Sequence, residues 1–257
     1  MSAPVVHFAG VTHDYVTPGG VTRALDGVEL RIESGERVAL LGPSGCGKST
    51  LLGIAEGLIA PTAGGAYLDD VKICKPHSDA GVVFQKDLLL NWKTVLDNVL
   101  LPVRLRKERV ADYRERALAL LKDVGLADFA DSRPTELSGG MRQRVAFCRA
   151  LVRDPDVLLL DEPFGALDAL TREQINTDLS SMMDTTQATA VLVTHSIEEA
   201  AFFADRIVVM SPRPGRIAEE IVVDVPRPRP AWPTVDHRFD EVLDRARRAI
   251  TSRKAAA

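Results

Sequence analysis

The sequence predicts an α/β fold in which strands alternate with helices around a parallel sheet. A glycine-rich segment at residues 42–50 follows a short apolar strand and precedes a helical stretch that starts near residue 51. A second alternating block contains apolar strand-like runs at residues 157–160, 190–193 and 207–210. Strands that alternate with helices in this way are typical of parallel α/β cores.

Residues before the glycine-rich segment have the composition of β-structure. Short β-rich runs occur at residues 5–8, 28–32 and 37–41, and Thr17-Pro18-Gly19-Gly20 is the clearest turn between them. After the glycine-rich segment, residues 61–65 are expected to break the helix. The runs at 66–68 and 80–84 then predict strands.

The stretch from about residue 94 to 153 is predicted to be helical. Thr94 with Asp97 resembles a capping box, and Leu101-Pro102 is expected to end that turn of helix. Apolar residues then recur at helical spacing from 110 to 124, with Gly125 as a stop. The helical block is therefore expected to be inserted within the α/β core.

Later helices are predicted from capping patterns and periodicity. Thr171 with Gln174 is expected to open one helix, and Ser196 with Glu199 the next. Residues 226–257 form a tail whose prolines predict a stiff, extended linker. An amphipathic helix is expected to follow, marked by Phe239, Val242, Leu243, Ala246 and Ile250.

Composition limits the classes of protein that fit the chain. Its 257 residues allow one large domain, or one domain with a small subdomain, and its net charge of −4 argues against a general nucleic-acid binder. No apolar run has the length needed to cross a bilayer, and the first residues lack the basic and apolar regions of a secretory signal. Three cysteines are too few and too scattered for a disulfide framework or a metal site, which fits a reducing cytosol.

The glycine-rich segment carries the strongest chemical signal. It matches the phosphate-binding pattern GxxxxGK[ST] with Gly42, Pro43, Ser44, Gly45, Cys46, Gly47, Lys48, Ser49 and Thr50. Its glycines let the backbone curl and direct N–H groups at an anion, and the following helix adds the positive end of its dipole. Lys48 would reach the β- and γ-phosphates, and the Ser49 hydroxyl would bind Mg²⁺. A glycine-rich turn with an incidental lysine is the alternative, which the flanking strand and helix disfavour.

Cys46 lies inside this loop and allows two interpretations. A positive environment lowers the pKa of a thiol and makes it reactive. The alternative is a small side chain at a tolerant loop position, and it is the better supported of the two.

Two adjacent carboxylates end the apolar strand at 157–160. Adjacent strand residues point to opposite faces, so Asp161 and Glu162 are expected to have different roles. Asp161 is placed to hold Mg²⁺, and Glu162 is placed to polarise a water that attacks the γ-phosphate. Solvated acids at the end of a buried strand are the alternative, and the phosphate-binding pattern upstream makes the functional interpretation the stronger one.

Residues 137–144, Leu-Ser-Gly-Gly-Met-Arg-Gln-Arg, resemble the LSGGQ signature of ATP-binding-cassette (ABC) proteins. Ser138, Gly139 and Gly140 precede a predicted helix from Met141 to about Val152, which would be a second anion-binding helix N-terminus. Taken alone, an ordinary serine N-cap explains the segment equally well. Met141 stands at the position of the signature glutamine.

The resemblance to ABC ATPases extends from about residue 5 to 225. It implies a P-loop NTPase core in a domain of residues 1–225, with an N-terminal antiparallel β subdomain and a helical subdomain inserted at about 86–153. It further implies that Gln85 is the Q-loop glutamine, linked to Mg²⁺ and the attacking water, and that His195 is the switch histidine at the γ-phosphate. Residues 165–168 resemble the D-loop, which touches the partner subunit.

Tyr15 resembles the A-loop aromatic residue that stacks on adenine. Stacking requires an exposed π-face and little else. A plain strand aromatic residue is the alternative interpretation for Tyr15.

The resemblance also implies partners. ABC cassettes pair head-to-tail as homodimers around ATP and Mg²⁺, and their Q-loop cleft receives a transmembrane permease; the apolar run 88–92 is expected to line that cleft. Residues 85–99, 210–217 and 225–228 are similar to importers of the nitrate/sulfonate/taurine group, which also use an extracytoplasmic solute-binding protein. The expected location is the cytoplasmic face of the plasma membrane, with no nucleic acid bound. A soluble non-transport ABC ATPase and a nucleotide-sensing regulator are the alternatives.

Overall fold

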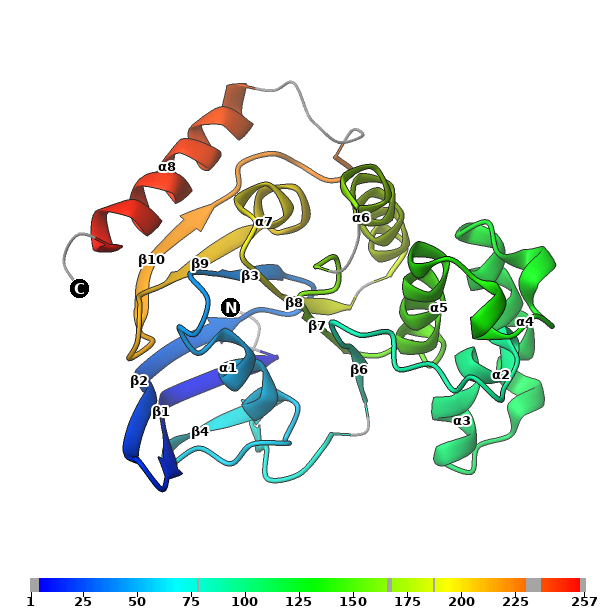
Figure 1. Ribbon diagram of the computed structural model, residues 1–257, viewed down its shortest axis with the longest axis horizontal. Helices are drawn as coiled ribbons and strands as arrows, with labels where there is room; N and C mark the ends of the chain where they lie inside the picture. The colour runs from blue at the N-terminus through cyan, green and yellow to red at the C-terminus, as the bar shows by residue number, and fades with distance from the viewer. Residues whose placement is uncertain (1–4, 78, 166–167, 187, 230–236, 255–257) are drawn as a thin grey trace. The chain divides into compact units, whose positions relative to one another are not determined.

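The structure is a computed structural model, and it describes residues 5–77, 79–165, 168–186, 188–229 and 237–254. The chain divides into two compact units, which are described separately (Figure 1). Unit 1 comprises Met1–Ser78 and Thr189–Ala257, and unit 2 comprises Asp79–Ala188. Among the described residues, no helix has the length and apolar character needed to cross a membrane.

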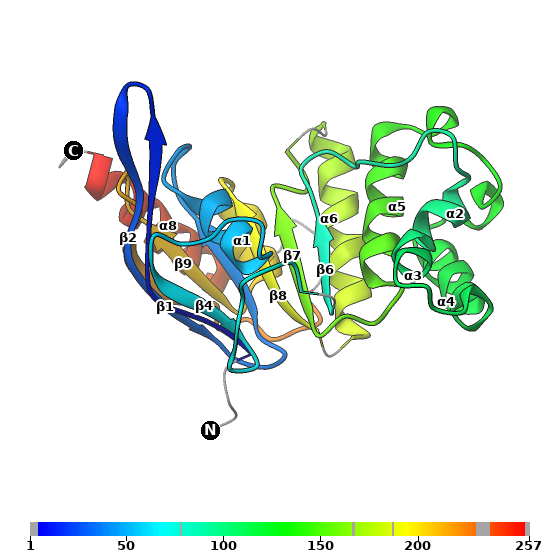
Figure 2. The ribbon, with the colours of Figure 1, turned by 90° about the horizontal axis from the view of Figure 1, so that it is seen from below.

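Unit 1 contains an antiparallel sheet with the strand order β2-β1-β4-β5. Its strands are β1 (Val6–Thr17), β2 (Gly20–Ile32), β4 (Ala63–Leu68) and β5 (Val71–Lys72). β1 and β2 form a long hairpin that closes at the predicted turn, where Thr17 pairs with Gly20 (Figure 2). The sequence therefore predicted the turn correctly but underestimated the length of the strands, because their outer ends are exposed and lack an apolar run.

The parallel strands of unit 1 are β3 (Arg37–Leu41), β8 (Thr189–Thr194) and β9 (Arg206–Met210). β3 lies between β8 and β9 and pairs parallel with both. All residues of β3 and β8 are buried, which explains the apolar runs at residues 38–41 and 190–193 within them. β10 (Ile217–Val222) pairs antiparallel with β9, and residues 211–216 join the two strands.

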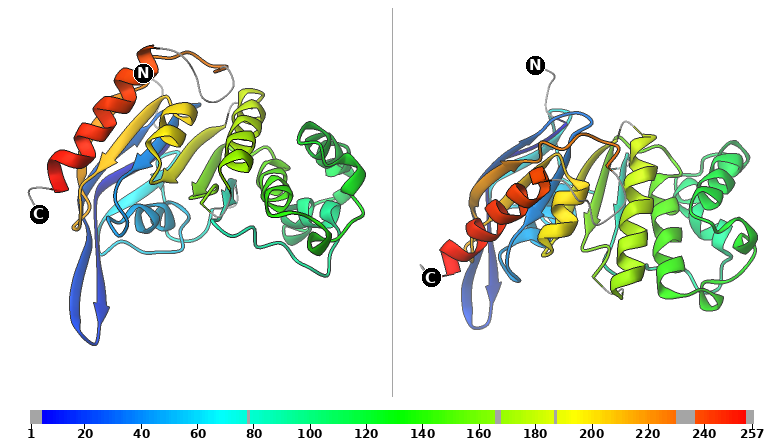
Figure 3. Two further views of the ribbon diagram at one scale, coloured as in Figure 1. Left: turned by 45° about the horizontal axis from the view of Figure 1, so that its top comes forward. Right: turned by 90° about the horizontal axis from the view of Figure 1, so that it is seen from above.

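The helices of unit 1 include α1 (Lys48–Ala55), α7 (Ile197–Phe203) and α8 (His237–Lys254). α1 begins at Lys48, inside the glycine-rich segment 42–50, rather than near residue 51 as expected. α8 runs beside α7 and β10 (Figure 3) and buries the apolar side chains of Phe239, Val242, Ala246 and Ala249. The predicted amphipathic helix is therefore packed against unit 1.

Unit 2 contains the parallel strands β6 (Ala80–Val83) and β7 (Val157–Asp161). Its helices are α2 (Val95–Val99), α3 (Leu101–Leu105), α4 (Val110–Asp123), α5 (Gly139–Leu151) and α6 (Ala169–Asp184). Short 3-10 turns occur at Ala127–Phe129 and Pro134–Glu136. The helical character expected for residues 94–153 is confirmed.

Two predicted helix starts are confirmed by their hydrogen bonds. The Thr94 hydroxyl accepts the Asp97 backbone N–H at 3.1 Å, and the Ser196 hydroxyl accepts the Glu199 N–H at 3.2 Å. Each hydroxyl satisfies a donor that has no partner within the first turn of a helix. Gly125, at φ 71°, follows α4 as the predicted stop.

Three local predictions were wrong. α6 begins at Ala169 rather than near Thr171, because the Asp168 carboxylate is the cap and accepts the Thr171 N–H at 3.0 Å. Leu101 begins α3 instead of ending a helix, and Pro102 is tolerated because first-turn N–H groups have no partner inside the helix. The helix expected to break at 61–65 already ends at Ala55, and the strand expected at 66–68 begins at Ala63 as β4.

Candidate functional site

The phosphate-binding pattern lies between β3 and α1 in unit 1. The loop requires glycine at two positions, Gly45 and Gly47, whose φ angles are 77° and 98°. A Cβ atom on Gly47 would lie 2.6 Å from Leu25 Cδ2 and 2.9 Å from the Ala24 carbonyl oxygen. The loop is thus held in a curled form against β2, with the N-terminus of α1 at its end.

Lys48 is nearly buried inside this loop. Its Nζ donates hydrogen bonds to the carbonyl oxygens of Gly42 at 2.8 Å and Pro43 at 3.1 Å. The ammonium group is therefore fixed by the loop itself, within a curled backbone that has the form of an anion cradle. Ser44 and Ser49 are exposed, and Thr50 is half-buried. This loop fits a phosphate group.

Cys46 is buried under the same loop, with 1% of its surface exposed. Burial raises the pKa of the Cys46 thiol, although the nearby Lys48 charge opposes that shift. A protonated, inaccessible thiol is a poor nucleophile. The interpretation of Cys46 as a small packed side chain is the one that fits this geometry.

Tyr15 lies on β1 beside the start of α1, and 41% of its surface is exposed. Its hydroxyl is 3.1 Å from the Thr50 hydroxyl, and its ring contacts His13 edge-on at a centroid distance of 4.5 Å. His13 is itself fixed by a 3.0 Å hydrogen bond to the Ala60 carbonyl oxygen. Tyr15 is therefore a positioned, exposed aromatic residue next to the phosphate loop.

His195 follows β8 in unit 1 and is exposed. The next residue, Ser196, caps α7, and the buried Glu199 accepts a short hydrogen bond from the Thr194 hydroxyl. These contacts fix the backbone on both sides of His195.

In unit 2, three of the candidate residues lie at the carboxyl ends of the paired parallel strands β6 and β7. Gln85 comes two residues after β6, Asp161 is the last residue of β7, and Glu162 follows it. A Cβ on Gly165 would lie 3.3 Å from Gln85 Nε2 and 3.6 Å from Glu162 Oε2, so these two side chains flank the same glycine.

Glu162 has a left-handed backbone with φ 42°, which is rare for a residue other than glycine. Strained backbone of this kind clusters at functional sites. This backbone directs the Glu162 side chain differently from a continued strand. The alternation of side chains along a strand therefore holds up to Asp161, the last residue of β7, and does not extend to Glu162.

The signature-like segment begins α5 of unit 2. Ser138 is the N-cap, and its hydroxyl accepts the Met141 N–H at 3.3 Å. Ser138 and Gly139 are exposed, whereas Gly140 is buried. A Cβ on Gly140 would lie 2.5 Å from Thr171 Cγ2, so this glycine allows α5 and α6 to approach closely. The exposed serine and glycine remain available to a ligand.

The D-loop-like segment is described only at its ends. Residues 166 and 167 lie outside the described residues. Asp168 caps α6, and the backbone N–H of Thr171 lowers the pKa of its carboxyl group.

The candidate residues therefore form two groups. Unit 1 holds Tyr15, residues 42–50 and His195; unit 2 holds Gln85, residues 138–140, Asp161 and Glu162.

A family profile described as ABC transporter matches residues 25–165, which is more than half of the chain. The chain belongs to the ABC transporter family. This ABC protein is 48% identical over 202 residues to the taurine import ATP-binding protein TauB of Jannaschia sp., covering 79% of this chain and 75% of TauB. It is 43% identical over 227 residues to the nitrate import ATP-binding protein NrtD of Synechococcus elongatus, covering 88% and 82% of the two chains.

Solved ABC structures show the same fold. The ATP-binding cassette MJ0796, solved as a dimer in a post-hydrolysis state with ADP and Pi, aligns with a TM-score of 0.75 at 36% identity. The alignment covers 86% of this chain and 99% of MJ0796. The predicted α/β P-loop fold and the predicted resemblance to the nitrate/sulfonate/taurine group are thereby confirmed, and the ABC protein is an ATPase.

Sequence reasoning missed one neighbour of the phosphate loop. Residues 211–216, which join β9 and β10, contact both β2 and the phosphate loop. Gly215 donates its N–H to the Ala24 carbonyl oxygen on β2 at 2.8 Å, and a Cβ on Gly215 would lie 2.0 Å from the Cys46 carbonyl oxygen. The glycine and the arginines of this segment are visible in the sequence, but nothing local indicates what they contact.

Proposed function

We propose that this chain is the ATP-hydrolysing subunit of an ABC importer, which couples ATP binding and hydrolysis in a cassette dimer to solute uptake through a separate permease. The observation that carries the proposal is its extensive identity to proteins named as import ATP-binding subunits. The solute class proposed is a small solute of the nitrate, sulfonate or taurine type, after the same relatives. The subunit is placed at the cytoplasmic face of the membrane as a peripheral protein.

In this proposal the phosphate loop binds the triphosphate through its backbone N–H groups and Lys48. The Lys48 ammonium already lies inside the loop, and it exchanges carbonyl partners for phosphate oxygens when a nucleotide enters. Tyr15 presents its exposed ring to adenine. Each role follows from the position of the side chain relative to the loop.

Ser49, Asp161 and Gln85 are the proposed Mg²⁺ ligands, because hard divalent cations prefer oxygen donors. When bound, Mg²⁺ neutralises charge on the phosphate oxygens. Glu162 is the proposed general base, oriented by its left-handed backbone, and Gln85 and His195 help to position the attacking water and the γ-phosphate.

The signature segment is proposed to act in a second copy of the chain. Ser138 and Gly139 are exposed at the N-terminus of α5, where backbone N–H groups favour an anion. In a head-to-tail homodimer, this end of α5 completes the nucleotide site of the partner. The dimeric state of MJ0796 supports the pairing.

The permease is proposed to dock on the segment after Gln85. Leu88 is 54% exposed and Trp92 is 71% exposed, so both present apolar surface in unit 2. An extracytoplasmic solute-binding protein is the proposed indirect partner. Pull-down of the membrane complex by the wild-type chain, but not by a Leu88→Asp/Trp92→Asp variant, would support this surface.

The role of Glu162 is tested by Glu162→Gln. The variant is expected to bind ATP, to lose nearly all steady-state hydrolysis and to accumulate as an ATP-bound dimer, because the amide cannot accept the proton from water. Phosphate release and size-exclusion chromatography with ATP measure the two effects. Glu115→Gln, an exposed carboxylate on α4, is the matched control. Unchanged hydrolysis in Glu162→Gln would remove Glu162 from the role of base.

The shared site is tested by mixing two inactive variants. Lys48→Ala disables the phosphate loop, and Ser138→Arg blocks the signature segment. Each homodimer should be inactive, whereas a mixed dimer keeps one site with both parts intact. Recovery of ATPase activity on mixing supports head-to-tail pairing, and no recovery at any ratio contradicts it.

A further inference from the structure

The segment that joins β9 and β10, residues 211–216, is hydrogen-bonded to β2 and is called here the β9–β10 loop. Gly215 donates its N–H to the Ala24 carbonyl oxygen at 2.8 Å, and its own carbonyl oxygen accepts the Asp26 N–H at 3.0 Å. These two bonds form a parallel bridge between Gly215 and Leu25. The loop is therefore attached to the part of β2 that also packs against the phosphate loop.

The β9–β10 loop also touches the phosphate loop directly. A Cβ on Gly215 would lie 2.0 Å from the Cys46 carbonyl oxygen, a distance that no side chain tolerates. On the same side, a Cβ on Gly42 would lie 3.0 Å from the Met210 carbonyl oxygen at the end of β9. The backbone of residues 42–46 is thus packed, on the side of β9, against the backbone of Met210 and Gly215, which limits its movement.

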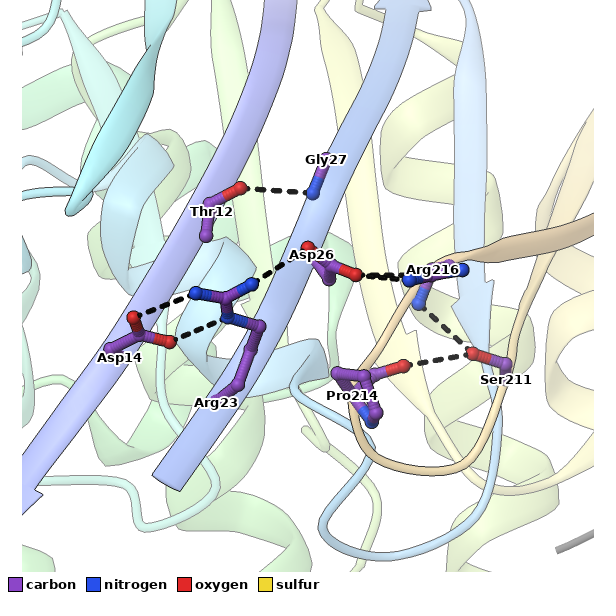
Figure 4. Close-up of polar contacts among 8 residues, drawn as sticks. All are labelled: Thr12, Asp14, Arg23, Asp26, Gly27, Ser211, Pro214 and Arg216. Atoms are coloured by element: carbon purple, nitrogen blue, oxygen red, sulfur yellow. Dashed lines mark hydrogen bonds and ion pairs between the residues drawn. The ribbon is translucent and has the colours of Figure 1, made fainter. Parts of the chain in front are cut away.

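A line of alternating charges fixes the β9–β10 loop to the hairpin (Figure 4). Arg216 donates from Nε to Asp26 Oδ2 at 2.9 Å and also from its terminal nitrogen. Arg23 contacts the other oxygen of Asp26 at 3.4 Å and pairs with Asp14 through two bonds of 2.9 and 3.2 Å. The Arg23 guanidinium lowers the pKa of the Asp14 carboxyl, so the carboxylate at that end of the line stays ionised.

The loop is also fixed internally. The Ser211 hydroxyl donates to the Pro214 carbonyl oxygen at 3.1 Å and accepts the Arg216 N–H at 3.0 Å (Figure 4). The Ser211 N–H closes the turn on the Arg216 carbonyl oxygen at 2.9 Å. A turn that is stabilised by its own hydrogen bonds therefore holds Gly215 against the phosphate loop.

We propose that the β9–β10 loop is a positioning element for the phosphate loop, with Gly215 as the contact and Arg216 as the residue that holds it in place. The inference rests on the proposed nucleotide site. An anion cradle binds only when its N–H groups are directed at one point, and a misplacement of about 1 Å can cost on the order of a hundredfold in function. By restricting the movement of the phosphate loop, the backbone of the β9–β10 loop therefore raises the affinity of the phosphate loop for nucleotide.

The exposure of the Arg216 ion pair separates this role from simple stabilisation. The Arg216 side chain is 63% exposed, and exposed ion pairs contribute about 0–1 kcal/mol to the stability of a protein. Loss of Arg216 should leave the unfolding transition nearly unchanged. If the loop then samples other positions, the fraction of molecules with a binding-competent cradle falls, and the apparent affinity falls in proportion.

The test measures ADP dissociation constants by calorimetry and thermal unfolding without nucleotide, on the full chain. Arg216→Gln is expected to weaken ADP binding about fivefold, and Gly215→Ala about tenfold or more, since affinity scales with the competent fraction. Arg216→Lys should recover part of the affinity, because it keeps one donor to Asp26. Arg245→Gln is the matched control: it removes an equally simple arginine–carboxylate pair, with Glu219 of β10, elsewhere in unit 1.

A purely electrostatic effect is tested by Arg213→Gln. Arg213 is exposed, and its Nε lies 3.5 Å from the Gly45 carbonyl oxygen, so it adds positive charge near the loop. Arg216→Lys keeps the positive charge, so an equal loss of ADP affinity in Arg213→Gln and Arg216→Gln together with full recovery in Arg216→Lys would overturn the positioning role. In an Asp26→Ala background, Arg216→Gln should have no additional effect, because the oxygens that accept from Arg216 are already removed.

Two outcomes distinguish this inference from the proposed nucleotide site. ADP binding by the wild type that is abolished in Lys48→Ala, with Arg216→Gln and Gly215→Ala both at wild-type affinity, overturns the positioning role alone. Failure of the wild-type chain to bind ADP, or equal binding by Lys48→Ala, overturns the nucleotide site itself.

Discussion

Arg229 is a residue whose surroundings explain how the tail is held. Its guanidinium is buried and donates to the carbonyl oxygens of Ala201, Phe202 and Ala204 at 3.0, 2.7 and 2.8 Å. These oxygens belong to the last turn of α7 and to its C-cap residue Ala204, where carbonyl groups lack partners within the helix and a cation is favoured. The guanidinium also lies 5.9 Å from the centre of the Phe239 ring on α8.

Replacement of Arg229 by methionine is expected to reduce the free energy of unfolding by about 2–4 kcal/mol, because buried carbonyl oxygens lose their donors. Urea unfolding followed by circular dichroism measures the loss. Arg227→Gln is the matched control: Arg227 pairs with Asp205 at 3.0 Å in a partly exposed site, so the loss should stay below about 1 kcal/mol. Equal midpoints for Arg229→Met and Arg227→Gln would show that the buried guanidinium does not anchor the tail.

The cysteines give a second prediction at this scale. Burial raises the pKa of the Cys46 thiol, so the thiolate is scarce at neutral pH and becomes more abundant only as the pH rises. Cys74 is exposed. Iodoacetamide at pH 7.5 is therefore expected to label Cys74 well before Cys46, as read by peptide mass mapping. Labelling of Cys46 at the rate of Cys74 in the folded protein would contradict the burial of this thiol.

At the scale of elements, the sequence predicts what is decided locally. Thr94 and Ser196 were recognised as caps because a cap and its partner lie three residues apart. Asp168 was missed because Thr171 offers the same pattern, and only the backbone geometry distinguishes the two. The β9–β10 loop could not be assigned, because its partner Asp26 is 190 residues away from Arg216.

The candidate site residues also divide into those that a local motif predicts and those whose contacts depend on residues far away in the sequence. The phosphate loop was predicted from a contiguous motif, and its curled glycines agree with that pattern. The contact between Tyr15 and Thr50 and the flanking of Gly165 by Gln85 and Glu162 depend on strand pairing, which a single sequence does not specify.

The packing of α5 on α6 yields a prediction about Gly140. Gly140→Ala places a methyl group 2.5 Å from Thr171 Cγ2, and such overpacking costs about 1–3 kcal/mol. Thr171→Ser removes that methyl group and keeps the hydroxyl, so the double variant should recover part of the stability. Thermal unfolding of the two single variants and the double variant measures the coupling. Additive losses would show that Gly140 and Thr171 do not meet.

At the scale of the whole molecule, the tail at residues 226–257 was predicted as a linker and a helix outside the ABC domain of residues 1–225. The described part of the tail packs within unit 1, through Arg229 and through the apolar face of α8. Pro226 and Pro228 lie in the described segment, whereas Pro230 and Pro233 lie outside it. These contacts argue that the tail contributes to the folding of unit 1.

Truncation after Val225 tests this view. It removes the Arg229 cap and four buried apolar side chains, of which Phe239 and Val242 are each worth about 1.5–3 kcal/mol and the two alanines less. Together these losses are comparable with the 5–15 kcal/mol that stabilises a typical domain. The shortened chain should therefore unfold at markedly lower urea concentration or accumulate as aggregates. Phe239→Ala is the milder variant, with an expected loss of about 3–5 kcal/mol. A shortening after Thr251, which keeps the buried face of α8, is the control and should match the full chain. Wild-type urea midpoints for both the truncation and Phe239→Ala would instead assign the tail to a separate appendage, free to serve a partner.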